Sequence, residues 1–515
     1  MQVVFSLAAC LAVLLFLTIR QAGAQWRRRA KANRLGCEPP IQYPHKRSWF
    51  LDPKGLDFQR KKLQALESGR FSSFCREQFV QLGPTFEQRT PAGRMILTKD
   101  RENFRAVLAL NFADYNKTTL RSGPALRFIG HGIFTRDGPS WKRSRNLLKP
   151  MFRRAELSDI NRLKKHVDRM LAWIPSDGCT VDMAPLLGKL FLDSGTEFVF
   201  GETSGALDSA SAKGDELLAA CRGSLFGLSR HRHAVNKPSP AIAKFFSHNV
   251  DKVHAFVDKQ VARALAPTKA KSFGTTKDVE NRTSERYVLL NEAAKQIRDA
   301  TELRFEMINV FLPAFETTSA VMSNALFHVA RNPEIWDELH RQAVELSDQP
   351  LTFELLKSLT YFRRVILEAL RIHGSSGRTV RTAVCDTVLP RGGGRDGYSP
   401  VFVSRGTEVL LDLTSHLNDP DIWGEDAHIF RPNRFESKIL KWDFLPFSGG
   451  PRVCPAEHQV LTQCVYLLVR LAQEFESMEN RDPCITYVEQ LKIMTESRNG
   501  VQVAWHRRAR NSTRV

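Results

Sequence analysis

A long helix that is apolar on nearly every face constrains the fold more than any other feature of the chain. Its middle reads "MINVFLPAFETTSAVMSNALFHVA", from Met307 to Ala330. Such a helix needs packing partners all round, so it belongs in the interior of a large protein. We expect it to run from about Glu285 to Ala330 and to end before Asn332-Pro333.

The rest of the chain predicts mostly helical surroundings for this helix. At 515 residues and 42% hydrophobic content, the chain can bury a large core. Residues 150–345 show long amphipathic stretches, and further helices are expected near 352–373 and 457–475. Short β-type runs occur only in "DTVLP", "PVFV" and "TEVLLDL", around a turn-rich segment at 391–400. The fold class predicted is mainly α with a small β subdomain.

The charge of the chain excludes some partners and favours others. The net charge is +20, but the basic residues are spread along the chain and no nucleic-acid-binding motif accompanies them. We therefore expect no nucleic acid partner. A basic surface suits an anionic membrane or an acidic protein instead.

The N-terminus predicts a membrane anchor. Residues 1–19 carry no charge, and Arg20 and a basic cluster at Trp26 to Lys31 follow them. A cleaved signal peptide is the alternative, since Ala22-Gly23-Ala24 resembles a cleavage site. No basic residue precedes the apolar run, however, and positive charge stays cytosolic. We therefore divide the chain into an anchor (1–19), a basic and Pro/Gly linker (20–46), a cytosolic catalytic domain (47–507) and a polar tail (508–515).

One of the nine cysteines lies where chemistry is expected. The stretch "FLPFSGGPRVCPAEHQV" places Cys454 in a glycine-containing turn just before a predicted helix. Backbone N–H groups, the helix dipole and Arg452 would all favour the thiolate there. A nucleophile would need a histidine base, and His458 need not face the sulfur. A zinc site would need further ligands at short spacing. A single thiolate instead suits an iron whose other ligands come from a porphyrin.

The segment "FSGGPRVC" resembles the Phe-x-x-Gly-x-Arg-x-Cys haem-ligand loop of the cytochrome P450 family. The resemblance implies that Cys454 is the axial ligand of haem b (iron protoporphyrin IX). It also implies that Phe447 packs near the thiolate, that Gly450 makes the turn and that Arg452 faces a haem propionate. The family usually has glycine two residues after the cysteine, where this chain has Ala456.

A Glu-x-x-Arg pair precedes this loop. Glu368 and Arg371 share a helix face and can pair, although Glu338 and Arg341 have the same spacing. The position of Glu368, between the long helix and the cysteine loop, distinguishes it. In the family such a pair is locked to an arginine in a segment like "FRPNRF", so Arg434 is expected to be the partner in a structural role.

The segment "PAFETTS", Pro313 to Ser319, resembles the oxygen-activating part of the family's long helix. The resemblance implies that Glu316 and Thr317 deliver protons while O2 is activated. The unrelated alternative is a solvated glutamate beside a threonine bonded to its own helix. Pro313 departs from the small residue usual at that position, and a proline inside a helix distorts it.

Further basic residues match positions that contact the haem carboxylates in the family. "DGPSWKRSR" resembles its Trp-x-x-x-Arg helix, with Trp141 and Arg145 one turn apart, and Arg381 matches another propionate contact. Lys142 or Arg143 could then face a redox partner.

No nucleotide-binding fingerprint occurs, because the glycines at 392–394 lack the following Lys-Ser/Thr and helix. Electrons would therefore come indirectly from NADPH through NADPH–cytochrome P450 reductase. The anchor implies a single-pass protein of the endoplasmic reticulum membrane.

Several stretches, such as "GHGIFTRDGPSWKRSR" and "DIWGEDAHIFRPNRF", are similar to the fungal membrane-bound group that hydroxylates n-alkanes and long-chain fatty acids. This similarity implies a lipophilic substrate and a narrow apolar channel, with Phe311, Leu312 and Phe315 near the site. The function predicted is a monooxygenase that inserts one oxygen atom from O2 into a C–H bond.

Three alternatives stay open at this point. The same haem fold could oxidise a secondary metabolite or rearrange an oxygenated lipid, a reaction for which Pro313 is the only motivation. From another class, the chain could be a membrane-anchored thiol hydrolase or a haem binder without catalysis.

Overall fold

The structure is a computed structural model that describes residues 26–46, 51–117, 123–152, 160–208, 212–233, 238–266 and 288–507. Residues 16, 20 and 23 are also described, and residues 53, 92, 176, 348, 375, 376, 438, 440 and 493 are not.

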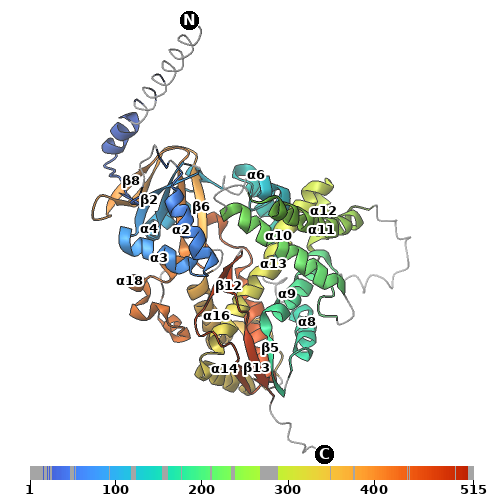
Figure 1. The fold of residues 1–515 in the computed structure, drawn as a ribbon. Helices are drawn as coiled ribbons and strands as arrows, with labels where there is room; N and C mark the ends of the chain where they lie inside the picture. The colour runs from blue at the N-terminus through green and yellow to red at the C-terminus, as the bar shows by residue number, and fades with distance from the viewer. Residues whose placement is uncertain are drawn as a thin grey trace, which may run out of the picture.

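The long apolar helix, α13 (Ala300–Val329), lies at the centre of a mainly helical protein (Figure 1). Its principal neighbours are α9, α11 and α16. The longer helices are α2 (Leu56–Glu67), α3 (Phe71–Leu82), α6 (Gly138–Leu148), α8 (Ile160–Ala172), α9 (Met183–Phe200), α10 (Ala212–His233), α11 (Pro240–Leu265), α12 (Leu289–Gln296), α14 (Pro333–Glu345), α16 (Thr360–His373) and α19 (Glu457–Glu474).

Short helices and turns connect these elements. They are α4 (Arg101–Arg105), η1 (Ala106–Leu110), η2 (Phe112–Asp114), α5 (Gly123–Ile129), η4 (Lys149–Phe152), α15 (Phe353–Ser358), α17 (Leu413–Leu417), α18 (Pro420–Trp423), η7 (Glu425–His428), η8 (Pro432–Glu436) and η9 (Gly450–Arg452). The helix predicted at 457–475 is confirmed as α19.

The predicted long helix is in fact two helices. α12 ends at Gln296, and α13 begins at Ala300, where the Asp299 carboxylate accepts a hydrogen bond from the Glu302 backbone N–H at 2.6 Å. An N-cap of this kind satisfies a helix end and starts a new helix. The predicted end before Asn332-Pro333 is confirmed. The helix expected at 352–373 is likewise divided, into α15 and α16, at Leu359.

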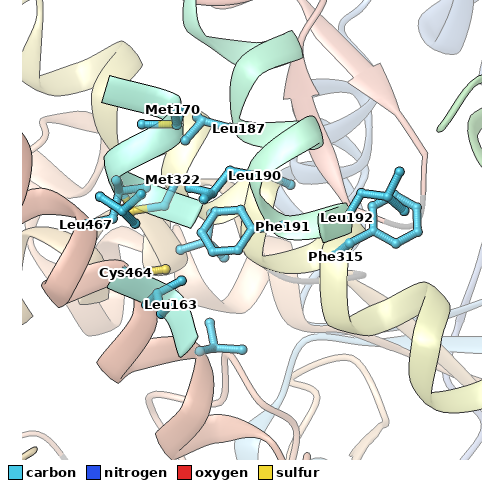
Figure 2. Packing of buried hydrophobic residues seen from close by; sticks show 14 of the residues in the cluster. Leu163, Met170, Leu187, Leu190, Phe191, Leu192, Phe315, Met322, Cys464 and Leu467 are labelled. Atoms are coloured by element: carbon cyan, nitrogen blue, oxygen red, sulfur yellow. The ribbon is translucent and has the colours of Figure 1, made fainter. Parts of the chain in front are cut away.

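One apolar core joins α8, α9, α13 and α19. Leu163 and Met170 from α8 meet Leu190 and Phe191 from α9, and Leu467 from α19 lies close by (Figure 2). These side chains are almost fully buried. Burial of this apolar surface is the main favourable contribution to folding, and it fixes the position of α13.

The β part of the described residues comprises a six-stranded sheet, which lies beside α2, α3 and α4 (Figure 1), and three smaller sheets. Its six-stranded sheet has the order β1-β2-β3-β9-β6-β4. The strands are β1 (Ile41–Gln42), β2 (Thr85–Thr90), β3 (Gly93–Thr98), β4 (Tyr115–Asn116), β5 (Asp177–Asp182), β6 (Arg378–Ala383), β7 (Thr387–Gly393), β8 (Ser399–Val403), β9 (Glu408–Asp412), β10 (Ser477–Asn480), β11 (Glu489–Leu491), β12 (Thr495–Ser497) and β13 (Gln502–His506).

The three predicted β runs are confirmed as β7, β8 and β9. The turn-rich segment at 391–400 is shorter than expected, because β7 and β8 pair as far as Gly393 and Ser399. In the main sheet β6 pairs antiparallel with β9 and places Arg381 opposite Val409.

Most of the expected membrane anchor, 1–19, lies outside the described residues, as do the polar segment at 275–286, which was expected to be a loop, and the tail at 508–515. Among the helices that the structure does describe, none has both the length and the apolar character needed to cross a bilayer.

Candidate active site around Cys454

Cys454 lies between η9 and α19, in a loop that its own backbone holds closed. The Cys454 backbone N–H donates to the Phe447 carbonyl at 3.0 Å, and the Phe447 ring packs against the main core. Gly450 has φ +69°, and a Cβ at this position would come within 1.8 Å of the Leu108 carbonyl oxygen. Only glycine allows both the backbone conformation and the close approach of η1.

Different groups around the Cys454 thiol shift its pKa in opposite directions. Burial, the largest effect, raises the pKa of Cys454, whereas the Ala456 N–H bonded to the sulfur and the nearby Arg145 lower it. The backbone of the turn therefore favours the thiolate as predicted, but the basic side chain that lowers the pKa is Arg145 instead of the expected Arg452, and burial outweighs both. The thiol still retains partial exposure.

Arg452 ties the cysteine loop to the segment before α6. Its guanidinium donates to the Arg136 carbonyl at 2.8 Å and to the Asp137 carboxylate at 2.6 Å. It also lies over the Trp141 ring, 4.5 Å from the centroid. The buried ion pair with Asp137 was not predicted. It gives Arg452 a role in fixing the loop, besides the expected role toward a haem carboxylate.

Arg145 and Arg381 extend toward the same region from α6 and β6. Arg381 is 3% exposed, and its guanidinium donates hydrogen bonds to the Thr379 hydroxyl and to the Val380 carbonyl. Burial, together with the charge of Arg452, lowers the pKa of Arg381 to about 10. Burial also lowers the pKa of Arg145. No carboxylate among the described residues lies within ion-pair distance of either guanidinium. A buried cation without a contact anion is costly, so this region fits an anionic group.

The middle of α13 differs from the rest of the helix, because one of its faces is only half-buried. Pro313, Ala314 and Thr317 keep partial exposure in a helix that is otherwise almost fully buried there. The Thr317 hydroxyl donates to the Pro313 carbonyl at 2.8 Å. Pro313 lies inside α13, which continues on both sides of it.

Glu316 is 2% exposed, and its Oε1 atom has no hydrogen-bond partner among the described residues. Burial, with a smaller contribution from Glu496, raises its pKa to about 6. Glu316 and Thr317 are consecutive but lie on different faces of the helix, and no hydrogen bond between them is found among the described residues. The solvated glutamate considered as an alternative is wrong, because Glu316 is buried. The other half of that alternative, a threonine bonded to its own helix, is confirmed at Thr317.

The apolar side chains expected to line a channel lie elsewhere. Phe311 and Phe315 are fully buried, and Phe311 packs on Phe200 and Phe256 with ring centroids 5.4 and 6.2 Å apart. Leu312 is also part of the main core. Phe315 and Thr317 are two residues apart and therefore point to nearly opposite sides of α13. These three residues belong to the core, which corrects the prediction.

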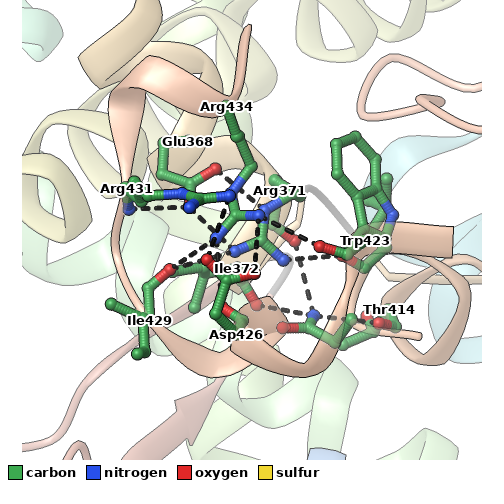
Figure 3. A network of polar contacts seen from close by, with 11 residues as sticks. Glu368, Arg371, Ile372, Thr414, Trp423, Asp426, Ile429, Arg431 and Arg434 are labelled. Atoms are coloured by element: carbon green, nitrogen blue, oxygen red, sulfur yellow. Dashed lines mark hydrogen bonds and ion pairs between the residues drawn. The ribbon is translucent and has the colours of Figure 1, made fainter. Parts of the chain in front are cut away.

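A buried polar network joins α16 to the segment that contains η7 and η8 (Figure 3). Arg371 donates to both oxygens of Glu368 at 2.8 Å, and Arg434 donates to Glu368 Oε1, also at 2.8 Å. Arg434 further donates to the carbonyls of Trp423, Asp426 and Ile429. The structure thus brings together all three residues predicted for the scaffold.

Sequence reasoning missed two groups near the site. Asp137 could have been noticed as an acidic residue directly before a helix that begins Gly-Pro. Glu306 on α13 gave no local signal. It is fully buried, and it accepts hydrogen bonds from Ser144 at 2.6 Å and from Arg136 at 2.8 Å. Asp137 and Glu306 together connect α6, α13 and the cysteine loop.

These residues fit a haem. The partly exposed Cys454 suits an axial ligand, and the half-buried Arg145 and the buried Arg381 suit the two carboxylates of the cofactor. The half-buried face at Pro313, Ala314 and Thr317 is consistent with an internal space beside α13.

Comparisons with known proteins agree with the resemblance to the cytochrome P450 family. The family model described as Cytochrome P450 matches residues 55–502. The chain is 36% identical to cytochrome P450 monooxygenase iccC of Talaromyces variabilis. The alignment spans 500 residues and covers 96% of each chain. It is 34% identical to cytochrome P450 monooxygenase himC of Aspergillus japonicus, over 91% of this chain and 83% of that one. It is 32% identical to cytochrome P450 monooxygenase tenA of Beauveria bassiana, over 97% of both. The chain therefore belongs to the cytochrome P450 family and is a monooxygenase of that family.

Proposed function

We propose that the protein inserts one oxygen atom from O2 into a C–H bond of a lipophilic small molecule. Haem b would be held by Cys454, and the electrons would come from NADPH through NADPH–cytochrome P450 reductase. The observation that carries the proposal is the convergence of Arg145 and Arg381, both without a contact carboxylate, on the region of Cys454 and Arg452.

When bound, haem supplies the iron that reacts with O2. The protein's own part begins with the sulfur of Cys454 as iron ligand, oriented by the hydrogen bond from Ala456. Arg145 and Arg381 would neutralise the haem carboxylates and so fix the orientation of the ring. Burial of these arginines strengthens such pairing, because little water competes for them.

Proton movement falls to Glu316 and Thr317. A carboxyl group with a pKa of about 6 can both hold and release a proton near neutral pH. The Thr317 hydroxyl is hydrogen-bonded only to Pro313 among the described residues, and rotation about one bond redirects it. The two residues would thus act in sequence, with Glu316 as the proton store and Thr317 as the donor nearer the reacting atoms.

The substrate is proposed only as a class. The resemblance to alkane and fatty-acid hydroxylases favours a long hydrocarbon, but the names of the three relatives specify no such substrate. Phe311, Leu312 and Phe315, which motivated a narrow apolar channel, belong to the core. An alkane, a fatty acid and a more compact, functionalised metabolite therefore all belong in the substrate screen.

We also propose that the protein acts at the cytosolic face of the endoplasmic reticulum membrane. The uncharged stretch at 1–19 and the basic residues after it support this location. On α6, Lys142 and Arg143 are exposed and offer positive charge to an acidic reductase.

The first test is the carbon monoxide difference spectrum of the reduced full-length protein, measured beside Cys454→Ser. A red-shifted Soret band typical of thiolate ligation is expected for the wild type and should disappear in the variant. Oxygen consumption and NADPH oxidation with reductase, measured for each substrate class, then test the reaction. If Cys454→Ser keeps the wild-type band, the assignment of the ligand is wrong and the thiol hydrolase alternative regains weight.

A further inference from the structure

Charged side chains from three segments surround Glu316 on α13. Arg222 lies on α10, Lys492 directly follows β11, and Glu496 lies on β12. All three are close enough to shift the pKa of Glu316, with Glu496 raising it and the two cations lowering it. Cys221, beside Arg222, is fully buried and also senses the charge of Glu316.

The four charges are not paired evenly. Lys492 donates to Glu496 at 2.5 Å, and both side chains are mostly buried. Arg222 has no carboxylate within 4 Å among the described residues, and its Nε atom is buried without a hydrogen-bond partner. A guanidinium stays charged at all ordinary pH values, so Arg222 cannot avoid this cost by losing a proton.

Two further atoms in this region lack partners. Besides Oε1 of Glu316, the Ser323 hydroxyl oxygen is unpartnered, and Ser323 is 3% exposed. Seven residues correspond to nearly two helical turns, so Glu316 and Ser323 lie on the same side of α13. Buried polar groups are nearly always hydrogen-bonded, and three unpartnered ones together indicate that another molecule completes them.

The neighbouring helix makes room for the guanidinium. A Cβ at Gly188 on α9 would lie 2.3 Å from Nη2 of Arg222. Any larger residue at 188 would push the Arg222 guanidinium out of its place. The position of Arg222 therefore depends on a glycine at one specific point of the facing helix.

We propose that Arg222, Glu316 and Ser323 form a polar subsite that binds an acidic oxygen group of the substrate, a carboxylate or an enolate. The guanidinium of Arg222 is the principal donor to this anion, and the Ser323 hydroxyl is a second donor. This inference rests on the proposed function, since it assigns the subsite to the substrate of the monooxygenase. It replaces the expectation of an all-hydrocarbon pocket with a lipophilic substrate that carries one acidic group.

Glu316 makes such a site compatible with a second negative charge. Two carboxylates close together share a proton, because both cannot remain ionised at low cost. Since the pKa of Glu316 is already about 6, an arriving anion would favour its protonated form. The protonated carboxyl group can then donate a hydrogen bond to the anion instead of repelling it.

The test measures binding to the full-length, haem-loaded protein by calorimetry and by the spin-state change of the Soret band. The probes are matched pairs on two scaffolds: dodecanoic acid with dodecanamide, and 4-phenylbutanoic acid with its amide. The variants are Arg222→Met, Arg222→Lys and Gly188→Ala, the last of which displaces the guanidinium without changing the charge. Arg230→Met is the matched control, because Arg230 is an exposed arginine on the same helix.

We expect the wild type to bind the acid of at least one pair about tenfold more tightly than the amide, the size of one charge-assisted hydrogen bond. Arg222→Met and Gly188→Ala should abolish this preference, Arg222→Lys should keep part of it, and Arg230→Met should leave it unchanged. Equal or absent binding of acid and amide in both pairs overturns the proposal. An acid preference that survives in Arg222→Met overturns it as well.

Failure of this inference is distinguishable from failure of the proposed function. Calorimetry reports binding without turnover, and the carbon monoxide spectrum reports haem ligation without substrate. A protein with the thiolate band and oxidation of a neutral substrate, but no acid preference, would keep its function and lose only the subsite.

Discussion

Two buried glutamates in this molecule have opposite surroundings. Glu368 on α16 and Glu316 on α13 are 0% and 2% exposed. Glu368 accepts hydrogen bonds from Arg371, Arg434 and the Arg431 backbone N–H, all within 2.9 Å. Glu316 has an oxygen without any partner among the described residues. The carboxylate that holds the scaffold has all its hydrogen bonds, whereas Glu316, for which we propose a role in proton transfer, is left able to change its charge.

The contrast follows from the cost of buried charge. An ion pair in the interior is stable only when hydrogen bonds satisfy both partners, and its two halves then depend on one another. A buried carboxyl group without such partners instead shifts its pKa toward neutrality. The same residue type is therefore a fixed anion on α16 and a carboxyl group with a raised pKa on α13.

Glu368→Ala should have the largest effect. It leaves Arg371 and Arg434 buried without their shared anion, and removal of one partner of a buried pair typically costs about 3–5 kcal/mol. We expect little folded protein and no haem retention, measured by urea unfolding of the soluble fraction and by haem content. A variant with wild-type haem content and unfolding midpoint would contradict the structural role of the network.

Arg434→Met should come next. It removes one cation from Glu368 and frees the carbonyls of Trp423, Asp426 and Ile429, but the bidentate pair with Arg371 remains. Loss of a hydrogen bond to a charged group costs about 1.5–3 kcal/mol. The unfolding free energy should fall by about that amount, with the Soret band of the surviving protein unchanged. An effect as large as that of Glu368→Ala would show that the two arginines are not separable.

Glu316→Gln should change pH dependence rather than folding. The folded-state pKa of about 6 lies above the usual 4.5, so ionisation of Glu316 disfavours the folded state by about 2 kcal/mol. The wild type therefore loses this stability as the pH rises from about 4.5 to 6, and the glutamine variant does not.

The check is the difference in unfolding free energy between Glu316→Gln and the wild type, measured from pH 4 to pH 7. The difference should grow in favour of the variant across this window, while turnover by the variant falls. A difference that is independent of pH would mean that Glu316 is ionised in the folded state as readily as in the unfolded chain.

Glu338→Ala should have the smallest effect and completes the comparison. Glu338 and Arg341 have the same Glu-x-x-Arg spacing as Glu368 and Arg371 and pair at 2.7 Å, but on the exposed face of α14. Exposed pairs are screened by water and contribute little. We expect an unchanged haem content and a thermal midpoint within experimental error of the wild type. A marked loss of stability would show that spacing, rather than burial, decides the value of such a pair.

The sequence predicted what depends on local spacing. The pairing of Glu368 with Arg371 follows from one helical turn, and the apolar character of residues 307–330 placed α13 in the interior. Arg434 required the family resemblance, because 63 residues separate it from Arg371 and no local rule connects them. The break at 297–299 was missed because Asp299 as an N-cap outweighed an otherwise continuous helical pattern.

The surroundings of Glu316 could not be predicted for a related reason. Arg222, Lys492 and Glu496 reach it from segments that are distant in sequence, and each has an ordinary local context. The surroundings of Phe311 and Phe315 could not be predicted either. Both were expected near an apolar channel at the site, but the rotation of α13 against α9 and α11 turns them into the core.

The cysteine loop has a consequence for how the enzyme matures. The contacts that hold the loop, from Arg452 to Asp137, from Cys454 to Phe447 and from Gly450 to Leu108, all come from the polypeptide. Less conformational entropy is lost when a cofactor enters a site that is already ordered. In a cell, newly made haem would then meet a cysteine loop that needs little rearrangement, and binding of the cofactor would further stabilise the folded chain.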